Sequence, residues 1–125
     1  MKRVIRENNA KYACIDIVFH KIAVPLENKN IYCMHTRQEK MEAFGRLLYV
    51  LDELREKCPW DKKQTNESLR PNTIEETYEL CDALARNDNA NICKELGDVL
   101  LHVCFYAKIG SEQGQFDMAD VCNKL

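Results

Sequence analysis

The segment 94–109, KELGDVLLHVCFYAKI, combines a surface that is apolar around most of a helix with two carboxylates. On a helix with 3.6 residues per turn, Glu95, Asp98 and His102 fall on one narrow stripe. A helix that is apolar nearly all round is expected to be buried, and a buried carboxylate needs a cation or a hydrogen-bonding partner. Lys94 lies outside the stripe on the helical wheel. The segment therefore predicts a buried helix whose acids require pairing or a bound cation.

The residues before this segment carry a second set of acids at helical spacing. Glu76 and Glu79 are three residues apart and Glu75 and Glu79 are four apart, so each pair can point toward one place. The residues between Glu79 and Glu95 are enough for the end of one helix, a short turn and the start of an antiparallel partner. The acidic pairs could then face each other across a helix hairpin. The alternative is a solvated acidic face, which is common on helices.

The two i,i+3 acidic pairs, Glu76 with Glu79 and Glu95 with Asp98, together offer four oxygen-donor side chains. Such a set, without a pair of thiolates or imidazoles, favours a hard cation such as Mg²⁺ or Mn²⁺ over zinc. Mg²⁺ held by carboxylates usually takes phosphate oxygens as its remaining ligands, and it can lower the pKa of a water. The predicted chemistry is attack of water on a phosphoanhydride, with Glu75 or one of the ligands accepting the proton. The sequence has no Walker glycine loop, which excludes a P-loop ATPase. The alternative is a buried salt-bridge network at a dimer interface.

Helical patterns cover the chain from Thr36 onward. Thr36, with Glu39 three residues later, predicts a capping box, and Cys58-Pro59 ends the first helix. The polar stretch CPWDKKQTNESLRP predicts a loop of about a dozen residues. The other helices are predicted from Pro71 or Asn72 to Arg86, from Ala90 to Gln113, and from a cap near Asp117 to the truncated end at Leu125. Residues 36–125 are expected to form one helical domain, and residues 1–35 an N-terminal extension that is poorly ordered or contains a short strand.

Composition excludes several classes of protein. A length of 125 residues suits one domain, and only four glycines and three prolines argue against many short strands and turns. A net charge of -2 argues against a nucleic-acid binder that works by bulk charge. No run approaches the ~20 apolar residues of a membrane span. The seven cysteines, without CxxC or a secretory signal, are interpreted as reduced core thiols of a cytoplasmic protein.

The pattern EETYE…ELGD, from Glu75 to Asp98, resembles the EExxE…ExxD motif of the MazG family of all-α nucleoside triphosphate pyrophosphohydrolases. CPWDKKQTNESLRP before it and FYAKIGSEQGQFDMADVCNKL after it extend the resemblance from about Thr36 to Leu125 and match the family's first, CPWD-bearing domain. The resemblance implies an all-α fold of four-helix-bundle type that dimerises, with one Mg²⁺ site per subunit that Mn²⁺ can also fill. It also implies hydrolysis of NTPs or dNTPs to monophosphate and pyrophosphate by a metal-bound water.

Carried over position by position, the resemblance makes Glu76, Glu79, Glu95 and Asp98 the metal ligands. It makes Glu75 a supporting acid or water-orienting base. Glu75, Glu76 and Glu79 are the predicted catalytic carboxylates.

Three further side chains are candidates for substrate binding. Trp60 could stack on a base, and Arg70 and Lys94 could contact phosphates. The alternatives are a loop-anchoring aromatic and solvent-exposed charges. His102 could orient a carboxylate, and the alternative is a satisfied core or interface histidine.

The expected partners are a nucleoside triphosphate substrate and further copies of the chain in a homodimer or higher homo-oligomer, with no nucleic acid and no membrane. The alternative function is a catalytically inactive or incomplete MazG-like domain that serves in dimer assembly or nucleotide binding. It is favoured by the point at which the resemblance stops, because the family's chain continues beyond the position of Leu125.

Overall fold

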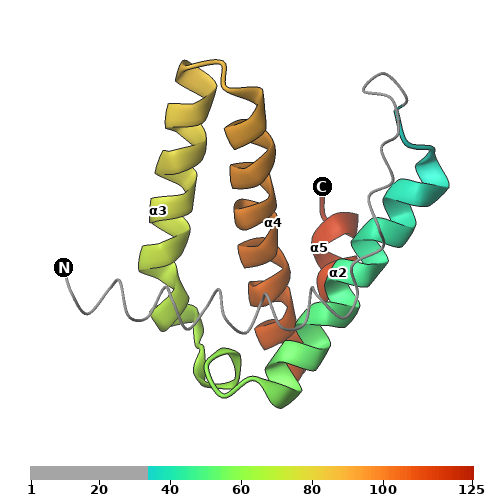
Figure 1. Ribbon diagram of the computed structural model, residues 1–125. Coiled ribbons are helices and arrows are strands. Elements are labelled where there is room, and N and C mark those ends of the chain that lie inside the picture. The colour runs from blue at the N-terminus through green and yellow to red at the C-terminus, as the bar shows by residue number, and fades with distance from the viewer. Residues whose placement is uncertain (1–33) are drawn as a thin grey trace. The chain divides into compact units, whose positions relative to one another are not determined.

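The computed structural model describes residues 34–125, so residues 1–33 of the predicted extension at 1–35 lie outside the described residues. Between residues 34 and 125 every regular element is a helix, which confirms the all-α class. The chain divides into two compact units between Lys63 and Gln64. In chain order the elements are α2 (Arg37–Lys57), the 3₁₀ helix η1 (Asp61–Lys63), α3 (Asn66–Ala85), α4 (Asn89–Glu112) and α5 (Met118–Asn123) (Figure 1).

The first unit is built around the C-terminal half of α2. The predicted capping box is confirmed, because the Glu39 amide donates to Thr36 Oγ1 over 3.2 Å and the Thr36 amide donates to Glu39 Oε2 over 2.7 Å. The helix ends at Lys57, before Cys58-Pro59, as predicted. A small core at the last turns of α2 consists of Val50, Leu54 and Cys58. The half-buried Trp60 packs against this core.

Helix α3 begins earlier than the start that was predicted from Pro71. It starts at Asn66 rather than at Pro71 or Asn72, so the predicted loop of about a dozen residues is shorter and contains η1. The physical reason is the cap: the Ser68 amide donates to Thr65 Oγ1 over 3.2 Å, and the Thr65 amide donates to Ser68 Oγ over 2.9 Å. Pro71 then lies inside the helix and forgoes one backbone hydrogen bond.

A tight turn joins α3 to α4 and sets how the two helices face each other. Asn87 has φ 52°, a left-handed conformation that asparagine tolerates. Its amide donates to the Leu84 carbonyl, and the Asp88 amide donates to the Ala83 carbonyl, both over 3.1 Å, which together make a Schellman motif. Asp88 then caps α4 by accepting from the Asn91 amide over 3.3 Å.

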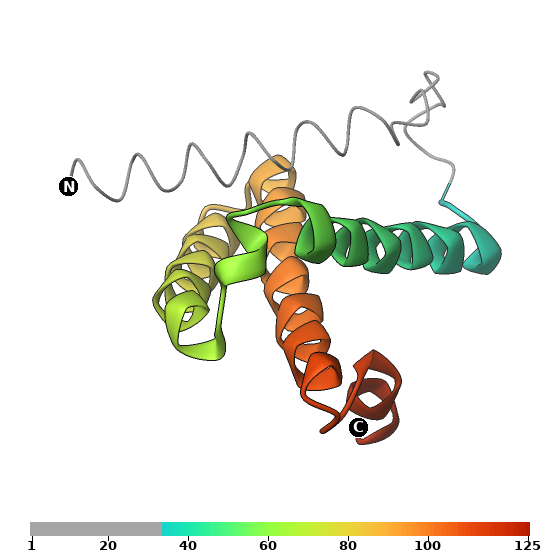
Figure 2. The same ribbon diagram turned by 90° about the horizontal axis from the view of Figure 1, so that it is seen from below.

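Helix α4 spans Asn89–Glu112, within one residue of the predicted Ala90 to Gln113 at each end. It packs antiparallel to α3, and α5 packs against its C-terminal end (Figure 1, Figure 2). Gly114, with φ +66°, ends α4 as predicted, and Asp117 caps α5 as predicted. The second unit is therefore a helix hairpin with a short helix at one end.

The prediction that the helix at residues 94–109 is buried nearly all round is wrong for the single chain, in which Leu96 of α4 is 52% exposed. Within the second unit, α3 packs along α4, and α5 covers only the C-terminal end of α4. Other apolar surface of the two long helices stays uncovered. The core is formed by Leu69 and Ala83 from α3 and by Cys104, Phe105, Ala107 and Ile109 from α4. The large apolar side chains left exposed on the two helices are Ile74, Tyr78, Leu84, Leu96, Leu100 and Val103.

The five described cysteines are all free thiols, in line with the prediction of reduced thiols. Cys58 and Cys104 are buried, whereas the prediction that the cysteines are core residues is wrong for the exposed Cys81, Cys93 and Cys122. Among the described helices, none has the length and hydropathy needed to cross a bilayer.

Candidate metal centre

Three of the four predicted ligands meet between α3 and α4. Each of Glu76, Glu79 and Glu95 offers one carboxylate oxygen, and these oxygens lie within 4.8 Å of one another. Glu76 and Glu79 are one turn apart on α3, and Glu95 is near the start of α4. The short turn at Asn87 brings the facing stripes of the two helices together, as the chain length between the acids predicted.

The group is acidic and partly withdrawn from water. Glu76 is 7% exposed and Glu95 is 6% exposed, while Glu79 lies at the open side. Glu95 Oε2 is buried and accepts no hydrogen bond from the described residues. Partial burial raises the pKa of Glu79, and the charges of Glu95 and Glu76 raise it further. A buried carboxylate oxygen without a donor, beside two more carboxylates, fits a hard cation.

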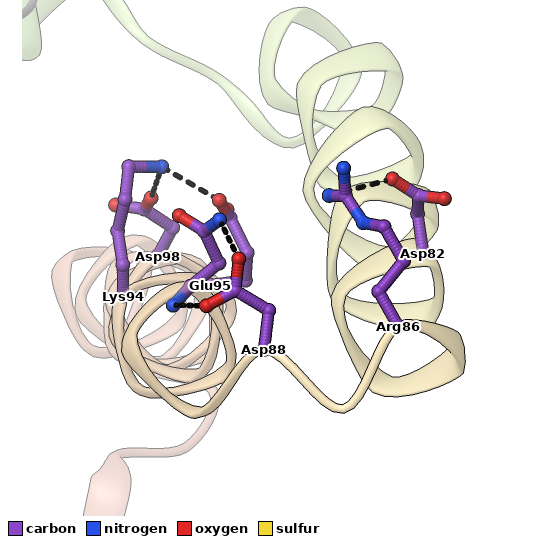
Figure 3. Close-up of polar contacts among 7 residues, drawn as sticks. Asp82, Arg86, Asp88, Lys94, Glu95 and Asp98 are labelled. Atoms are coloured by element: carbon purple, nitrogen blue, oxygen red, sulfur yellow. Dashed lines mark hydrogen bonds and ion pairs between the residues drawn. The ribbon is translucent and has the colours of Figure 1, made fainter.

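Asp98, the fourth predicted ligand, lies outside this three-carboxylate group and contacts Lys94 instead. Lys94 Nζ is 2.8 Å from Glu95 Oε1 and 3.0 Å from Asp98 Oδ2 (Figure 3). The hydrogen bonds to these two carboxylates raise the pKa of Lys94 far above its ordinary value. The helical wheel placed Lys94 outside the acidic stripe, but its long flexible side chain carries the ammonium back to it.

One cluster next to the acids was missed by the sequence reasoning. Thr73 Oγ1 lies 2.7 Å from His102 Nδ1 and 2.6 Å from Tyr106 Oη, and it donates to the Leu69 carbonyl over 3.1 Å. His102 is 2% exposed, so the alternative of a satisfied core histidine describes it. All three contacts of Thr73 are satisfied when His102 and Tyr106 donate and Thr73 gives its one proton to Leu69.

A signal for this cluster was present in the sequence. Thr73 precedes Glu76 by three residues, and His102 follows Asp98 by four. If the acids face each other across an antiparallel hairpin, these two side chains must also face each other one turn further along.

The other predicted site residues are more exposed. Glu75 and Arg70 lie on exposed positions of α3, and Glu75 is not part of the three-carboxylate group. Trp60 lies in the first unit, where it packs against the small core and so fits its alternative as a loop anchor. The roles of these three residues in catalysis and substrate binding stay predictions.

Comparison with known proteins supports the reading of the acidic motif. The family model of the MazG nucleotide pyrophosphohydrolase domain matches residues 64–125. The nucleoside triphosphate pyrophosphohydrolase of Escherichia coli K12 is 47% identical over 85 residues, which is 66% of this chain and 32% of that protein. The nucleoside triphosphate pyrophosphohydrolase/pyrophosphatase MazG of Thermotoga maritima is 46% identical over 84 residues, covering 66% of this chain and 33% of that protein.

A nucleoside triphosphate pyrophosphohydrolase of Mycobacterium tuberculosis is 42% identical over 78 residues, covering 61% of this chain and 24% of that protein. The chain thus spans a third or less of the length of these curated relatives. The matched residues 64–125 are those of the second compact unit, which holds the three-carboxylate group. Through this unit the chain belongs to the MazG nucleotide pyrophosphohydrolase domain family.

Proposed function

We propose that this protein hydrolyses nucleoside triphosphates, NTPs or dNTPs, to monophosphate and pyrophosphate with the help of a divalent cation. The observation that carries the proposal is the convergence of Glu76, Glu79 and Glu95, in which a buried oxygen of Glu95 has no donor among the described residues. The family match and the names of the relatives support the reaction class.

Glu76, Glu79 and Glu95 would hold the cation, with Asp98 as a fourth ligand. An all-oxygen set of this kind suits Mg²⁺, with Mn²⁺ as a substitute. A divalent cation, when bound, offsets the negative charge of phosphate oxygens and lowers the pKa of a water. The acidic group needs such a cation before a polyanion can approach, because four carboxylates near a triphosphate would otherwise repel it.

The reaction requires a proton acceptor as well as a binding site. The oxygen of a water forms a bond to the α-phosphorus while the bond from that phosphorus to the α,β-bridging oxygen breaks, and pyrophosphate leaves. The water gives up a proton, which a carboxylate accepts. Glu75 is our choice for this role, because it is exposed on α3 one turn before Glu79 and is not part of the three-carboxylate group.

Substrate contacts are assigned to three side chains. Arg70 and Lys94 would bind phosphate oxygens, since both are exposed cations on the two helices that carry the acids. Trp60 would contribute its half-exposed indole to the base.

A homodimer or higher homo-oligomer is part of the proposal. The exposed apolar side chains on α3 and α4 support it, because four of them, Ile74, Tyr78, Leu84 and Leu96, are each more than half exposed in the single chain.

A second function is a MazG-like domain that binds nucleotide or assembles without turnover. The ion pairs of Lys94 favour it, because they satisfy Glu95 and Asp98 in part without any metal. In that case the acids would act as a salt-bridge network.

The test is a panel of NTPs and dNTPs incubated with the purified chain in Mg²⁺ or in EDTA, with monophosphate and pyrophosphate quantified. Three proteins are compared: the wild type, Glu79→Gln, and Asp82→Asn as a matched control. Asp82 is on the same helix, is exposed and pairs with Arg86 over 2.8 Å, so its loss removes one acid without touching the carboxylate group.

We expect Mg²⁺-dependent release of both products by the wild type and by Asp82→Asn. For Glu79→Gln we expect a loss of at least about a hundredfold, the scale of losing one group that acts in the transition state. Phosphate release in place of pyrophosphate would refute the proposed bond cleavage. Absence of turnover, with nucleotide still bound, would establish the second function.

A further inference from the structure

The ammonium group of Lys94 lies against the acidic centre. Its Nζ is within hydrogen-bond distance of one oxygen of Glu95 and one of Asp98, two predicted ligands of the same cation (Figure 3). The side chain of Glu95 is 8% exposed and that of Asp98 is 21% exposed, whereas that of Lys94 is 53% exposed. A half-exposed cation therefore compensates a buried acid.

This arrangement differs from an ordinary ion pair on a helix surface. Exposed i,i+4 pairs contribute little, because water solvates both charges when they separate. Glu95 is buried, so water would solvate its carboxylate poorly if the pair separated. Its Oε2 already lacks a donor among the described residues. Lys94 therefore supplies charge compensation for the buried carboxylate of Glu95.

A divalent cation bound to Glu95 and Asp98 would share both carboxylates with the ammonium of Lys94, which holds one oxygen of each. Two cations at one pair of carboxylates repel each other, and the carboxylate lone pairs are shared between them. The lysine is the movable partner, because its ammonium is half exposed on a flexible four-carbon stem. Glu95 is packed between the helices and cannot turn to solvent without exposing them.

We propose that Lys94 is the resident counter-ion of the acidic centre, and that a divalent cation binds by displacing its ammonium from Glu95 and Asp98. Lys94 then sets how tightly the centre binds the cation, and cation binding releases a positive charge beside the bound metal. The inference deepens the proposed function, since it rests on these acids being the cation site. The released ammonium would be placed to meet a phosphate oxygen of the substrate.

Exchange denotes this displacement of the Lys94 ammonium by the divalent cation. The variant Lys94→Met keeps most of the aliphatic stem and removes the charge. Exchange predicts that this variant is less stable without metal but binds the divalent cation more tightly. In EDTA the variant should unfold at lower temperature than the wild type, because the carboxylates lose their counter-ion. Its affinity for the divalent cation should rise, because no ammonium has to be displaced. We expect Kd to fall about tenfold, roughly 1.4 kcal/mol of binding free energy.

The control variants separate exchange from general effects. Arg86→Met removes one positive charge and one i,i+4 ion pair, to Asp82, from the same hairpin without touching the acidic centre (Figure 3). It should leave Kd unchanged within about twofold. Lys94→Arg keeps the charge and should keep Kd near the wild-type value.

The experiment measures Mn²⁺ binding by electron paramagnetic resonance of the free ion, and Mg²⁺ binding by competition, for these four proteins and for Glu79→Gln. Thermal unfolding is followed in EDTA and in saturating Mg²⁺. Tighter binding by Lys94→Met alone, with a lower melting temperature in EDTA and a larger rise with Mg²⁺, supports exchange. Equal or weaker binding by Lys94→Met overturns it, because a lysine that only stabilises the hairpin lowers the melting temperature without tightening Kd.

Failure of the inference and failure of the proposed function give different results. If wild type and Lys94→Met bind Mn²⁺ equally and Glu79→Gln does not bind, the metal site stands and exchange is wrong. If none of the proteins binds Mn²⁺, both the metal dependence and exchange are wrong. If Lys94→Met binds and the wild type does not, exchange holds and Lys94 blocks the site in this chain.

Discussion

Replacing Thr73 with valine should loosen the hairpin that holds the acidic centre. Valine has the shape of threonine and is also branched at Cβ, so the substitution removes a hydroxyl with little change in volume or helix propensity. The hydroxyl makes two contacts across the hairpin, at 2.7 Å to His102 Nδ1 and at 2.6 Å to Tyr106 Oη.

The expected loss follows from these two contacts. A hydrogen bond within a protein contributes about 0.5–1.5 kcal/mol net, and a buried group that loses its partner costs about 1–3 kcal/mol. The ring of His102 is 2% exposed, so water does not readily replace the lost contact there. The two terms together predict that Thr73→Val lowers the free energy of unfolding by about 2–3 kcal/mol. That is a large share of the ~5–15 kcal/mol that stabilises a typical domain.

The assay is urea unfolding in EDTA, followed by far-ultraviolet circular dichroism. Thr73→Ser is the matched control, because it keeps the hydroxyl and loses one methyl, for which we expect a loss below about 1 kcal/mol. A double-mutant cycle with Tyr106→Phe isolates the Thr73–Tyr106 contact. An equal loss for the valine and serine variants would refute the reasoning, since the methyl and not the hydroxyl would then be what matters.

Three further predictions concern the pH dependence, the hairpin turn and the thiols. Because the pKa of Glu79 is raised in the folded state, its charged form destabilises the metal-free fold. This destabilisation is absent at pH below the ordinary pKa of 4.5 and is fully present once the pH exceeds the raised pKa. Glu79→Gln should therefore melt higher than the wild type at pH 7 in EDTA and equal to it near pH 4, and a lower melting temperature at pH 7 would contradict this. Asn87→Gly should be neutral or stabilise by up to about 1 kcal/mol, while Asn87→Val should destabilise by about 1–2 kcal/mol in urea unfolding, because φ is 52° there. Burial raises the pKa of the Cys104 thiol, so mass spectrometry after brief alkylation of the native protein at pH 8 should find Cys104 unlabelled. Rapid labelling is expected at the exposed cysteines, Cys81, Cys93 and Cys122.

Much of the helical pattern follows from local chemistry. The caps at Thr36 and Asp117 and the end of α4 before Gly114 were predictable, because each depends on side chains within a few residues. The start of α3 was predicted wrongly for a related reason. Two local signals competed, and the capping box at Thr65 prevailed over the preference of Pro71 for a first turn.

Part of the acidic centre was predictable in the same way. The i,i+3 spacing places Glu76 and Glu79 on one side of α3, and the short connection makes an antiparallel partner the simplest way to bring Glu95 opposite them. The contact of Lys94 with Asp98 was also predictable, because residues four apart are neighbours on a helix, but the sequence analysis considered only the narrow stripe and left Lys94 outside it. The hydrogen bond of Lys94 to Glu95, the next residue in the chain, depends on the flexible lysine side chain.

The sequence by itself determined where the helices occur and which acids share a stripe, because helical spacing depends only on near neighbours. The tertiary structure decided which groups meet and which stay exposed. It joined Thr73 to His102, brought carboxylate oxygens of Glu76, Glu79 and Glu95 within 4.8 Å of one another, and left Tyr78 73% exposed. Burial and pairing depend on what packs against each helix, and an apolar stripe is the same in sequence whether it meets another helix of its own chain or another surface.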